Sequence, residues 1–189
     1  MACRLARTDK EYGMDDLSKL GLKYGTDKIG KHNYLPVYYD LFKDRRNEVK
    51  KVLEIGVGEG KGVRMFRDFF PNAMIFGLEI DKSRLFIEDR IEVTLCDQSN
   101  KEDLLYGFGC IGGNIDLVID DGSHRTSDQF FSAVVLVPLL KEGSIYVIED
   151  VHEQKSLEDM LNTHFEFIPE ITLIKCGNRY DDNLIIIKK

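Results

Sequence analysis

Three glycines at alternating positions follow an acidic residue in the first third of the chain. Glu54 is followed by Gly56, Gly58 and Gly60, at the end of a short apolar run that predicts a buried strand. Since glycine has no Cβ, a strand-to-helix turn of this kind lets a ligand approach the backbone closely. Dinucleotide sites favour the spacing G-x-G-x-x-G, but position 61 is Lys61. The spacing therefore favours a different ligand, with a tight turn that binds nothing as the structural alternative.

Acidic residues also stand where the next two predicted strands end. The second strand ends near Glu79 and Asp81, and the third ends near Asp97. A carboxylate about 20 residues after such glycines can accept hydrogen bonds from two ribose hydroxyls, so we expect Glu79 in that role, with Asp81 next. We expect Asp97 to accept from an adenine amino group. Each acid alone fits a helix N-cap, but their succession at strand ends favours a nucleoside.

Four carboxylates and a histidine follow the fourth and fifth predicted strands. Asp120 and Asp121 end the fourth strand, and Glu149 and Asp150 end the fifth. Carboxylates this close repel each other unless something positive lies between them. Oxygen ligands suit a hard cation, Mg²⁺ first and then Mn²⁺ or Ca²⁺. His124 is placed to accept a proton from a hydroxyl that the cation acidifies. The alternative is that an aspartate caps the next helix and His124 is a loop residue.

The elements that must position these residues form a βαβ pattern typical of a parallel sheet. The predicted strands are 51–56, 73–80, 91–96, 115–120 and 144–149, followed by an edge hairpin of 165–176 and 183–188. The predicted helices are 61–69, 83–88, 99–106, 126–140 and 155–163, with two more at 14–22 and 35–46 before the first strand. We expect one domain over 1–189, in which a helical leader (1–49) caps the α/β core (50–189).

Composition excludes several classes of protein. The chain has 189 residues, is 43% hydrophobic and 31% charged, and carries a net charge of −7. These values are those of a globular domain, and no dense basic run predicts a nucleic-acid partner. No apolar run approaches the roughly 20 residues needed to span a bilayer, and the first residues do not predict a secretory signal. The four cysteines are far apart, so we expect reduced thiols in a cytoplasmic protein.

The glycine loop with its preceding acid resembles motif I of the class I S-adenosylmethionine (SAM) methyltransferases. That resemblance implies a three-layer, Rossmann-like α/β fold with a seven-stranded sheet, mostly parallel with an antiparallel last strand. Three further motifs narrow the likeness to the metal-dependent O-methyltransferases of macrolide sugars, the mycinamicin and macrocin type. They are Tyr24-Gly25-Thr26-Asp27-Lys28 with His32-Asn33-Tyr34, then Asp121-Gly122-Ser123-His124, then Glu149-Asp150. The macrolide enzymes are about twice this length and carry an extra N-terminal domain.

The narrower resemblance implies a Mg²⁺ site formed by Asp121, Glu149 and Asp150, with His124 as general base. The resemblance selects Asp121 rather than Asp120 as the metal ligand, a choice that the residues alone do not decide. We place Asp120, Thr26 and Tyr34 with the cofactor contacts. The expected contacts are then Glu54, Gly56, Gly58, Gly60, Glu79, Asp97, Asp120, Thr26 and Tyr34. For Tyr34, packing of the leader is an equally good alternative.

We predict an enzyme of natural product biosynthesis that transfers a methyl group from SAM to a hydroxyl of a sugar or sugar-bearing small molecule, with Mg²⁺ or another hard divalent cation. A vicinal diol suits a chelating ion, so catechols fit as well. We expect no membrane partner, and a homo-oligomer is left open. The alternatives are a metal-independent methyltransferase acting on nitrogen or carboxyl groups, a SAM-binding protein without catalysis, and a nicotinamide oxidoreductase, which the glycine spacing disfavours.

Overall fold

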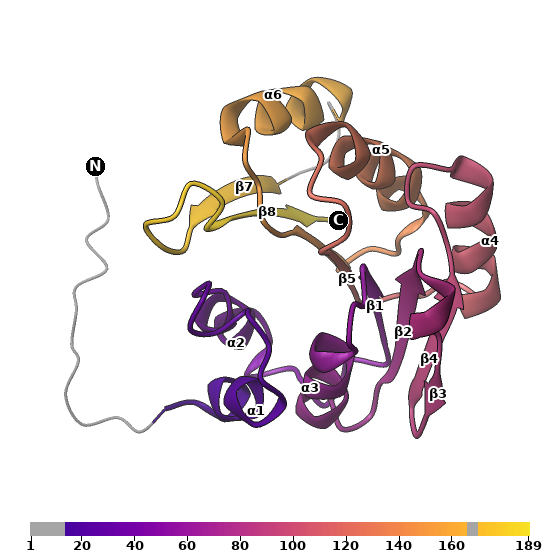
Figure 1. The fold of residues 1–189 in the computed structure, drawn as a ribbon. Coiled ribbons are helices and arrows are strands. Elements are labelled where there is room, and N and C mark those ends of the chain that lie inside the picture. The colour runs from indigo at the N-terminus through magenta and orange to yellow at the C-terminus, as the bar shows by residue number, and fades with distance from the viewer. Residues whose placement is uncertain (1–13, 166–169) are drawn as a thin grey trace.

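The computed structural model describes residues 14–165 and 170–189. They form one eight-stranded sheet in the order β3-β4-β2-β1-β5-β6-β8-β7 (Figure 1). The strands are β1 Lys51–Ile55, β2 Met74–Glu79, β3 Ile87–Glu88, β4 Ile91–Leu95, β5 Leu117–Asp120, β6 Ile145–Ile148, β7 Glu170–Lys175 and β8 Asn183–Lys188. The helices are α1 Asp16–Tyr24, α2 Leu35–Phe42, α3 Lys61–Phe69, α4 Lys101–Ile111, α5 Thr126–Leu136 and α6 Gln154–His164, with 3₁₀ turns η1 Lys82–Arg84 and η2 Val137–Leu139.

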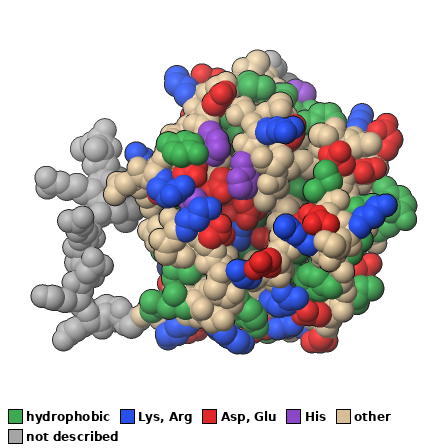
Figure 2. Space-filling model, in the orientation of Figure 1, with side chains coloured by type: hydrophobic (Ala, Val, Ile, Leu, Met, Phe, Trp, Pro, Cys, Tyr) green, Lys and Arg blue, Asp and Glu red, His purple; other side chains and the backbone are tan. Residues whose placement is uncertain are grey.

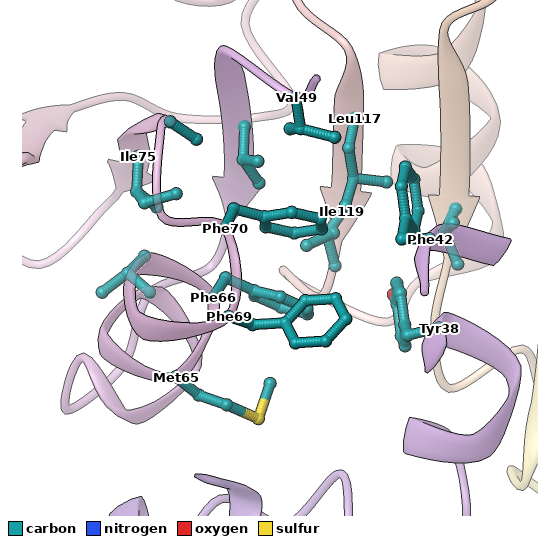
Figure 3. Close-up of a cluster of buried hydrophobic side chains, with 14 of the residues drawn as sticks. Tyr38, Phe42, Val49, Met65, Phe66, Phe69, Phe70, Ile75, Leu117 and Ile119 are labelled. Carbon is teal, nitrogen blue, oxygen red and sulfur yellow. The ribbon is translucent and has the colours of Figure 1, made fainter. Parts of the chain in front are cut away.

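Both faces of the sheet are buried under helices, so the fold has three layers. Helices α1, α2 and α3 lie on one side of the sheet in Figure 1, and α4, α5 and α6 lie on the other. Successive strand residues face opposite ways: Val52 packs in the cluster under α1–α3, and Leu53 packs in the cluster under α4–α6. Figure 3 shows the first cluster, where Phe66 and Phe70 of the α3 region lie beside Ile119 of β5.

The central strands create the place where a ligand binds in folds of this kind. Strand β1 pairs in parallel with β2 on one side and with β5 on the other. The order of the strands therefore reverses at β1: β2 and β4 follow on one side, and β5 and β6 follow on the other. A crevice forms at this switch point, beyond the carboxyl ends of β1 and β5. Strand β8 lies antiparallel between β6 and β7, which confirms the predicted antiparallel last strand.

One predicted element has a different secondary structure, and another lies partly outside the described residues. The helix predicted over 83–88 is wrong: Asp81 caps the short turn η1, and Ile87 and Glu88 form strand β3, antiparallel to β4. The turn between these strands includes Arg90 with φ 56°, a left-handed conformation that a helix does not contain. This strand raises the count from the seven predicted to eight. Of the strand predicted over 165–176, positions 166–169 lie outside the described residues.

The segment before β1 reaches the crevice, where residues 25–28 form part of its lining. Helix α1 ends at Gly25, whose φ of 67° stops the helix. The chain then runs through Lys28 and His32 to α2, and the Lys28 and His32 side chains are both buried. Among the described residues, every helix is too short or too polar to cross a membrane.

Candidate active site

A cleft of about 760 Å³ lies at the carboxyl ends of the central strands. Its lining includes residues of the glycine loop, the ends of β2 and β4, and the loop after β5. Acidic and histidine side chains gather near the middle of the view in Figure 2, with Lys and Arg side chains around them. A volume of this size falls in the range of small-molecule and cofactor sites.

Each glycine of the loop is required for a different physical reason. A Cβ on Gly56 would lie 2.2 Å from the carbonyl oxygen of Asp121, so this glycine lets the loops after β1 and β5 pass each other. A Cβ on Gly60 would meet the side chains of Arg64 and Phe86. Gly58 has a φ of 56° and faces open space in the cleft; the nearest atom to its Cβ position in the described part of the chain, apart from its chain neighbours, is a guanidinium nitrogen of Arg84 at 3.9 Å. Gly58 is therefore the glycine whose bare backbone a ligand can approach.

The two acids expected at the nucleoside end lie in the cleft. Glu79 is buried, and one of its carboxylate oxygens accepts hydrogen bonds from the backbone N–H groups of Val57 and Gly58, at 3.1 and 2.8 Å. This carboxylate thus fixes the glycine loop as well as facing the cleft. Asp97 accepts from the backbone N–H and hydroxyl of Ser99 through one oxygen. Asp81, the second choice for the ribose, caps η1 instead and is exposed.

Glu54 provides an unpaired acceptor in the cleft wall. Its side chain is 2% exposed, and Oε2 has no hydrogen-bond partner among residues 14–165 and 170–189. Burial raises the pKa of Glu54 to about 7, against the opposing effect of Lys28. A Cβ on Gly62 would lie 2.3 Å from Oε1 of Glu54, so the first turn of α3 closes over this carboxylate. A buried acceptor that faces a cleft without a partner is costly unless a ligand donates to it.

Lys28 occupies the centre of the acidic residues. Its Nζ lies 2.5 Å from Glu149 Oε2, 2.6 Å from Asp121 Oδ2 and 3.3 Å from Glu54 Oε1, and its side chain is 2% exposed. Burial alone would lower the pKa of Lys28, but the three carboxylates hold it well above its usual value. The other oxygen of Glu149 accepts from the hydroxyl of Tyr38. The positive charge that these carboxylates require is therefore supplied, in part, by the protein itself.

Asp121 and His124 form the outer part of the cluster at the cleft, together with Asp150, which is buried beside them. One ligand atom from each lies within 4.8 Å of the others. His124 Nε2 is 3.1 Å from Asp121 Oδ1 and 3.5 Å from Asp150 Oδ2. The hydrogen bond to Asp121 raises the pKa of His124, while Lys28 and His124 lower the pKa of Asp121 in spite of its burial. His124 and Asp150 both have positive φ, 58° and 50°, a strain that residues other than glycine adopt chiefly where the surroundings enforce it.

Side chains of the leader hold Asp150 in this conformation. The hydroxyl of Tyr34 lies 2.6 Å from Asp150 Oδ1 and 2.9 Å from the carbonyl oxygen of Asp181. His32 stacks on Tyr34 and shares a 2.7 Å hydrogen bond with Asp182 through Nδ1. Tyr34, which we expected beside the cofactor, is 1% exposed and lies behind Asp150 instead. Thr26, by contrast, lines the cleft.

Asp120 is not at the cleft. Its carboxylate is fully buried and accepts hydrogen bonds from Gln98, Ser132 and Tyr146 at 3.0, 2.7 and 3.1 Å. We expected this residue among the cofactor contacts, but its side chain lies in the core and does not line the cleft. The alternation of side chains along a strand explains the difference: Asp120, the last residue of β5, points into the core, and Asp121 points toward Lys28.

The chemistry of these residues fits both expected groups. SAM carries an amino group and a ribose, which would find acceptors in Glu54 Oε2 and Glu79, and Gly58 leaves room for close approach. A hard divalent cation finds carboxylate oxygens of Asp121 and Asp150 close together. Glu149 lies beside them, but Lys28 and Tyr38 take both of its oxygens.

Several residues that line the cleft could be named from the sequence, among them Glu54, Glu79 and Asp121, but the buried partners of the acids could not. Lys28 and Tyr38 reach Glu149 across 121 and 111 positions of the chain, and Gln98 contacts the loop after β5 across 25 positions. Two signals pointed to Lys28: its place in the motif Tyr24–Lys28, and the requirement for a positive charge among the acids, which we assigned to a cation.

Comparison with known proteins identifies the class. The fold superposes on the MycE methyltransferase of the mycinamycin biosynthetic pathway, in complex with Mg and SAH, with a TM-score of 0.76 and 30% identity over 92% of this chain and 54% of that one. A second structure of that enzyme, with Mg, SAH and mycinamycin VI, gives a TM-score of 0.74. The protein thus has the class I SAM-dependent methyltransferase fold. No protein-family model matches the chain.

Within that class, the chain is homologous to O-methyltransferases of macrolide and tetracenomycin sugars. It is 41% identical over 145 residues to the mycinamicin VI 2''-O-methyltransferase of Micromonospora griseorubida, a match that covers 72% of this chain and 36% of that enzyme. It is 37% identical over 143 residues to the 8-demethyl-8-alpha-L-rhamnosyl tetracenomycin-C 2'-O-methyltransferase of Streptomyces olivaceus, covering 71% and 37%. The chain therefore spans little more than a third of the length of these curated relatives.

Proposed function

We propose that the protein is a SAM-dependent, divalent-cation-dependent methyltransferase that acts on a hydroxyl group of a sugar or sugar-bearing natural product. The observation that carries this proposal is the position of His124, whose Nε2 lies between Asp121 and Asp150 on the wall of the cleft that the glycine loop also lines. The names of the relatives, which are all O-methyltransferases, support the class of acceptor.

The cofactor end of the cleft would bind SAM through the residues already described. Gly58 would allow the ligand against the loop, Glu79 would accept from the ribose, and Glu54 would accept from the amino group. When bound, SAM supplies a methyl group on a positively charged sulfur, which is the electrophile of the reaction. Aligning this methyl group with an acceptor oxygen contributes most of the rate in a displacement of this type.

The other end of the cleft would bind the acceptor and take its proton. Asp121 and Asp150 would hold the cation, with Glu149 behind them, and a bound divalent cation lowers the pKa of a hydroxyl that it contacts. His124 would accept the hydroxyl proton at a ring nitrogen that carries none, which requires the imidazole in its neutral form. The nearby carboxylates of Asp121 and Asp150 would stabilise the imidazolium that results.

One observation favours a second candidate, a methyltransferase that needs no metal. Lys28 already supplies positive charge between Asp121 and Glu149, so the acidic cluster does not by itself demand a cation. In this case His124 and the carboxylates would contact the acceptor directly.

A methyl-transfer assay separates the two candidates. The protein would be incubated with labelled SAM and a panel of acceptors containing rhamnosides, other deoxyhexosides, catechols and amines, with Mg²⁺ or with excess EDTA. The proposal predicts labelled methyl ethers of sugar hydroxyls that EDTA abolishes. Transfer that survives EDTA would support the metal-independent candidate, and no transfer to any oxygen acceptor would contradict the proposal.

A further inference from the structure

Lys28 is a buried lysine whose partners are all acidic. Its ammonium contacts Asp121 and Glu149 at hydrogen-bond distance and lies 3.3 Å from Glu54. These three carboxylates come from the β1, β5 and β6 regions of the sheet, whereas Lys28 comes from the loop between α1 and α2. A single side chain of the leader thus connects the acidic ends of three neighbouring strands.

The acidic cluster divides into two parts around this ammonium. In the inner part, Glu149 is 1% exposed, and its two oxygens are taken by Lys28 and Tyr38. In the outer part, Asp121 turns its second oxygen toward His124, and the buried Asp150 lies beside His124. Lys28 contacts Glu149 in the inner part and one oxygen of Asp121 in the outer part, so its ammonium joins the two parts.

We propose that Lys28 is the internal counter-cation of this cluster, a positioning residue that keeps Glu149 and Asp121 assembled at the cleft before any divalent cation arrives. Several carboxylates buried side by side repel each other, and a buried charge that loses its partner destabilises a fold strongly. Through Lys28, the leader segment therefore contributes a positive charge that offsets the negative charge of the buried carboxylates in the site. This inference goes beyond the proposed function and does not depend on methyl transfer.

A double-mutant cycle tests the charge of Lys28 apart from its packing. The melting temperature would be measured in EDTA for the wild type, Lys28→Met, Glu149→Gln and the double variant. Methionine keeps the length of the side chain, and glutamine keeps an oxygen for Tyr38. We expect Lys28→Met to lower the melting temperature by roughly 10 °C, because it leaves a buried carboxylate unpaired. Adding Glu149→Gln should restore a large part of this loss.

A matched control is available three residues further along the chain. Lys31 pairs with Asp27 on the surface, and their side chains are 46% and 54% exposed. Lys31→Met makes the same chemical change without removing a buried charge, so it should shift the melting temperature by no more than about 2 °C.

Each result of the double-mutant cycle either supports or overturns the proposal. A Lys28→Met variant that fails to fold alone but folds together with Glu149→Gln supports the proposal as strongly as a restored melting temperature. Additive effects of the two changes, an unfolded double variant, or a loss no larger than that of Lys31→Met would overturn it.

Addition of Mg²⁺ separates this proposal from the proposed function. If Lys28 neutralises the floor of a cation site, Mg²⁺ should raise the melting temperature of Lys28→Met more than that of the wild type, because the ion replaces the missing charge. No Mg²⁺ shift in either protein would count against the metal site and leave the coupling between Lys28 and Glu149 intact. An equal shift in both would show that the ion and the ammonium do not share the same carboxylates, which contradicts the proposal.

Discussion

The backbone N–H of Ser123 donates a 2.6 Å hydrogen bond to Oε1 of Gln98. This contact joins the end of β4 to the loop that carries Asp121 and His124. The other end of the Gln98 amide donates to Asp120 and Ser132 in the core. A Cβ on Gly122 would lie 2.0 Å from Oε1 of Gln98, so this loop and the amide fit each other closely. Gln98 thus anchors the loop that presents the proposed base.

The first prediction concerns this anchor. Gln98→Ala removes the partner of the Ser123 N–H and one partner of Asp120, and unpaired buried polar groups cost about 1–3 kcal/mol each. The variant should lose roughly 5 °C in melting temperature and should turn over more slowly, because the loop loosens. The matched control is Asp97→Ala at the preceding position, which faces the cleft and should weaken SAM binding with little change in melting temperature. Reversed effects of the two variants would contradict these assignments.

The second prediction concerns the glycine loop. Gly58→Val places a branched side chain at a φ of 56° in the open part of the cleft. The valine side chain would occupy the space that the ligand needs beside the loop, so the Kd for SAM measured by calorimetry should rise by roughly tenfold or more. Gly109 is a suitable control, because it lies in α4 with no atom within 4 Å of its Cβ position, and Gly109→Ala should leave the Kd unchanged. Unaltered SAM affinity in Gly58→Val would refute the position of the cofactor.

The third prediction concerns the proposed base. His124→Ala should lower kcat by about 10²–10⁴-fold, the usual contribution of a general base, with little change in the Kd for SAM. His152 provides the control, because it is exposed and contacts the ring of Tyr180, so His152→Ala should keep full turnover. Equal kcat in the two variants would remove His124 from the chemistry.

The fourth prediction concerns pH and the buried Glu54. A carboxyl whose pKa rises from 4.5 to about 7 on folding binds its proton more tightly in the folded state. Its contribution to stability is therefore fully present below pH 4.5 and is lost as the pH rises through 7, a loss on the order of 3 kcal/mol. Without ligands, the melting temperature should fall across this window, and Glu54→Gln should flatten the fall. The same slope in both proteins would contradict the assignment to Glu54.

Much of the fold follows from local patterns that the structure confirms. Helix α3 begins at Lys61 and ends at Phe69, as predicted, because glycines precede it and its apolar residues recur at helical spacing. The prediction of a helix over 83–88 was wrong because the apolar residues of this segment suit a helix and a short strand equally well. There, the antiparallel register of Ile87 with Glu92 decides the structure, and a single sequence does not reveal that register.

The cleft residues could be predicted because parallel strands bring their carboxyl ends to one edge of the sheet. The hydrogen bonds that join these residues to the rest of the protein could not be predicted. The hydrogen bond between Tyr34 and Asp150 connects positions 116 residues apart, and the burial of Asp120 depends on Gln98 and Ser132, which come from other elements. These contacts depend on tertiary packing, and no spacing within the chain encodes them.

The central claim is that Asp121 and Asp150 hold a divalent cation beside His124. Titration with Mn²⁺, followed by the paramagnetic resonance of the free ion, tests it directly in the wild type and in Asp150→Ala. The account predicts one tight site per chain in the wild type and at least about tenfold weaker binding in the variant, the range seen when metal-site residues are lost. The same number of bound ions with the same affinity in both proteins would contradict the claim.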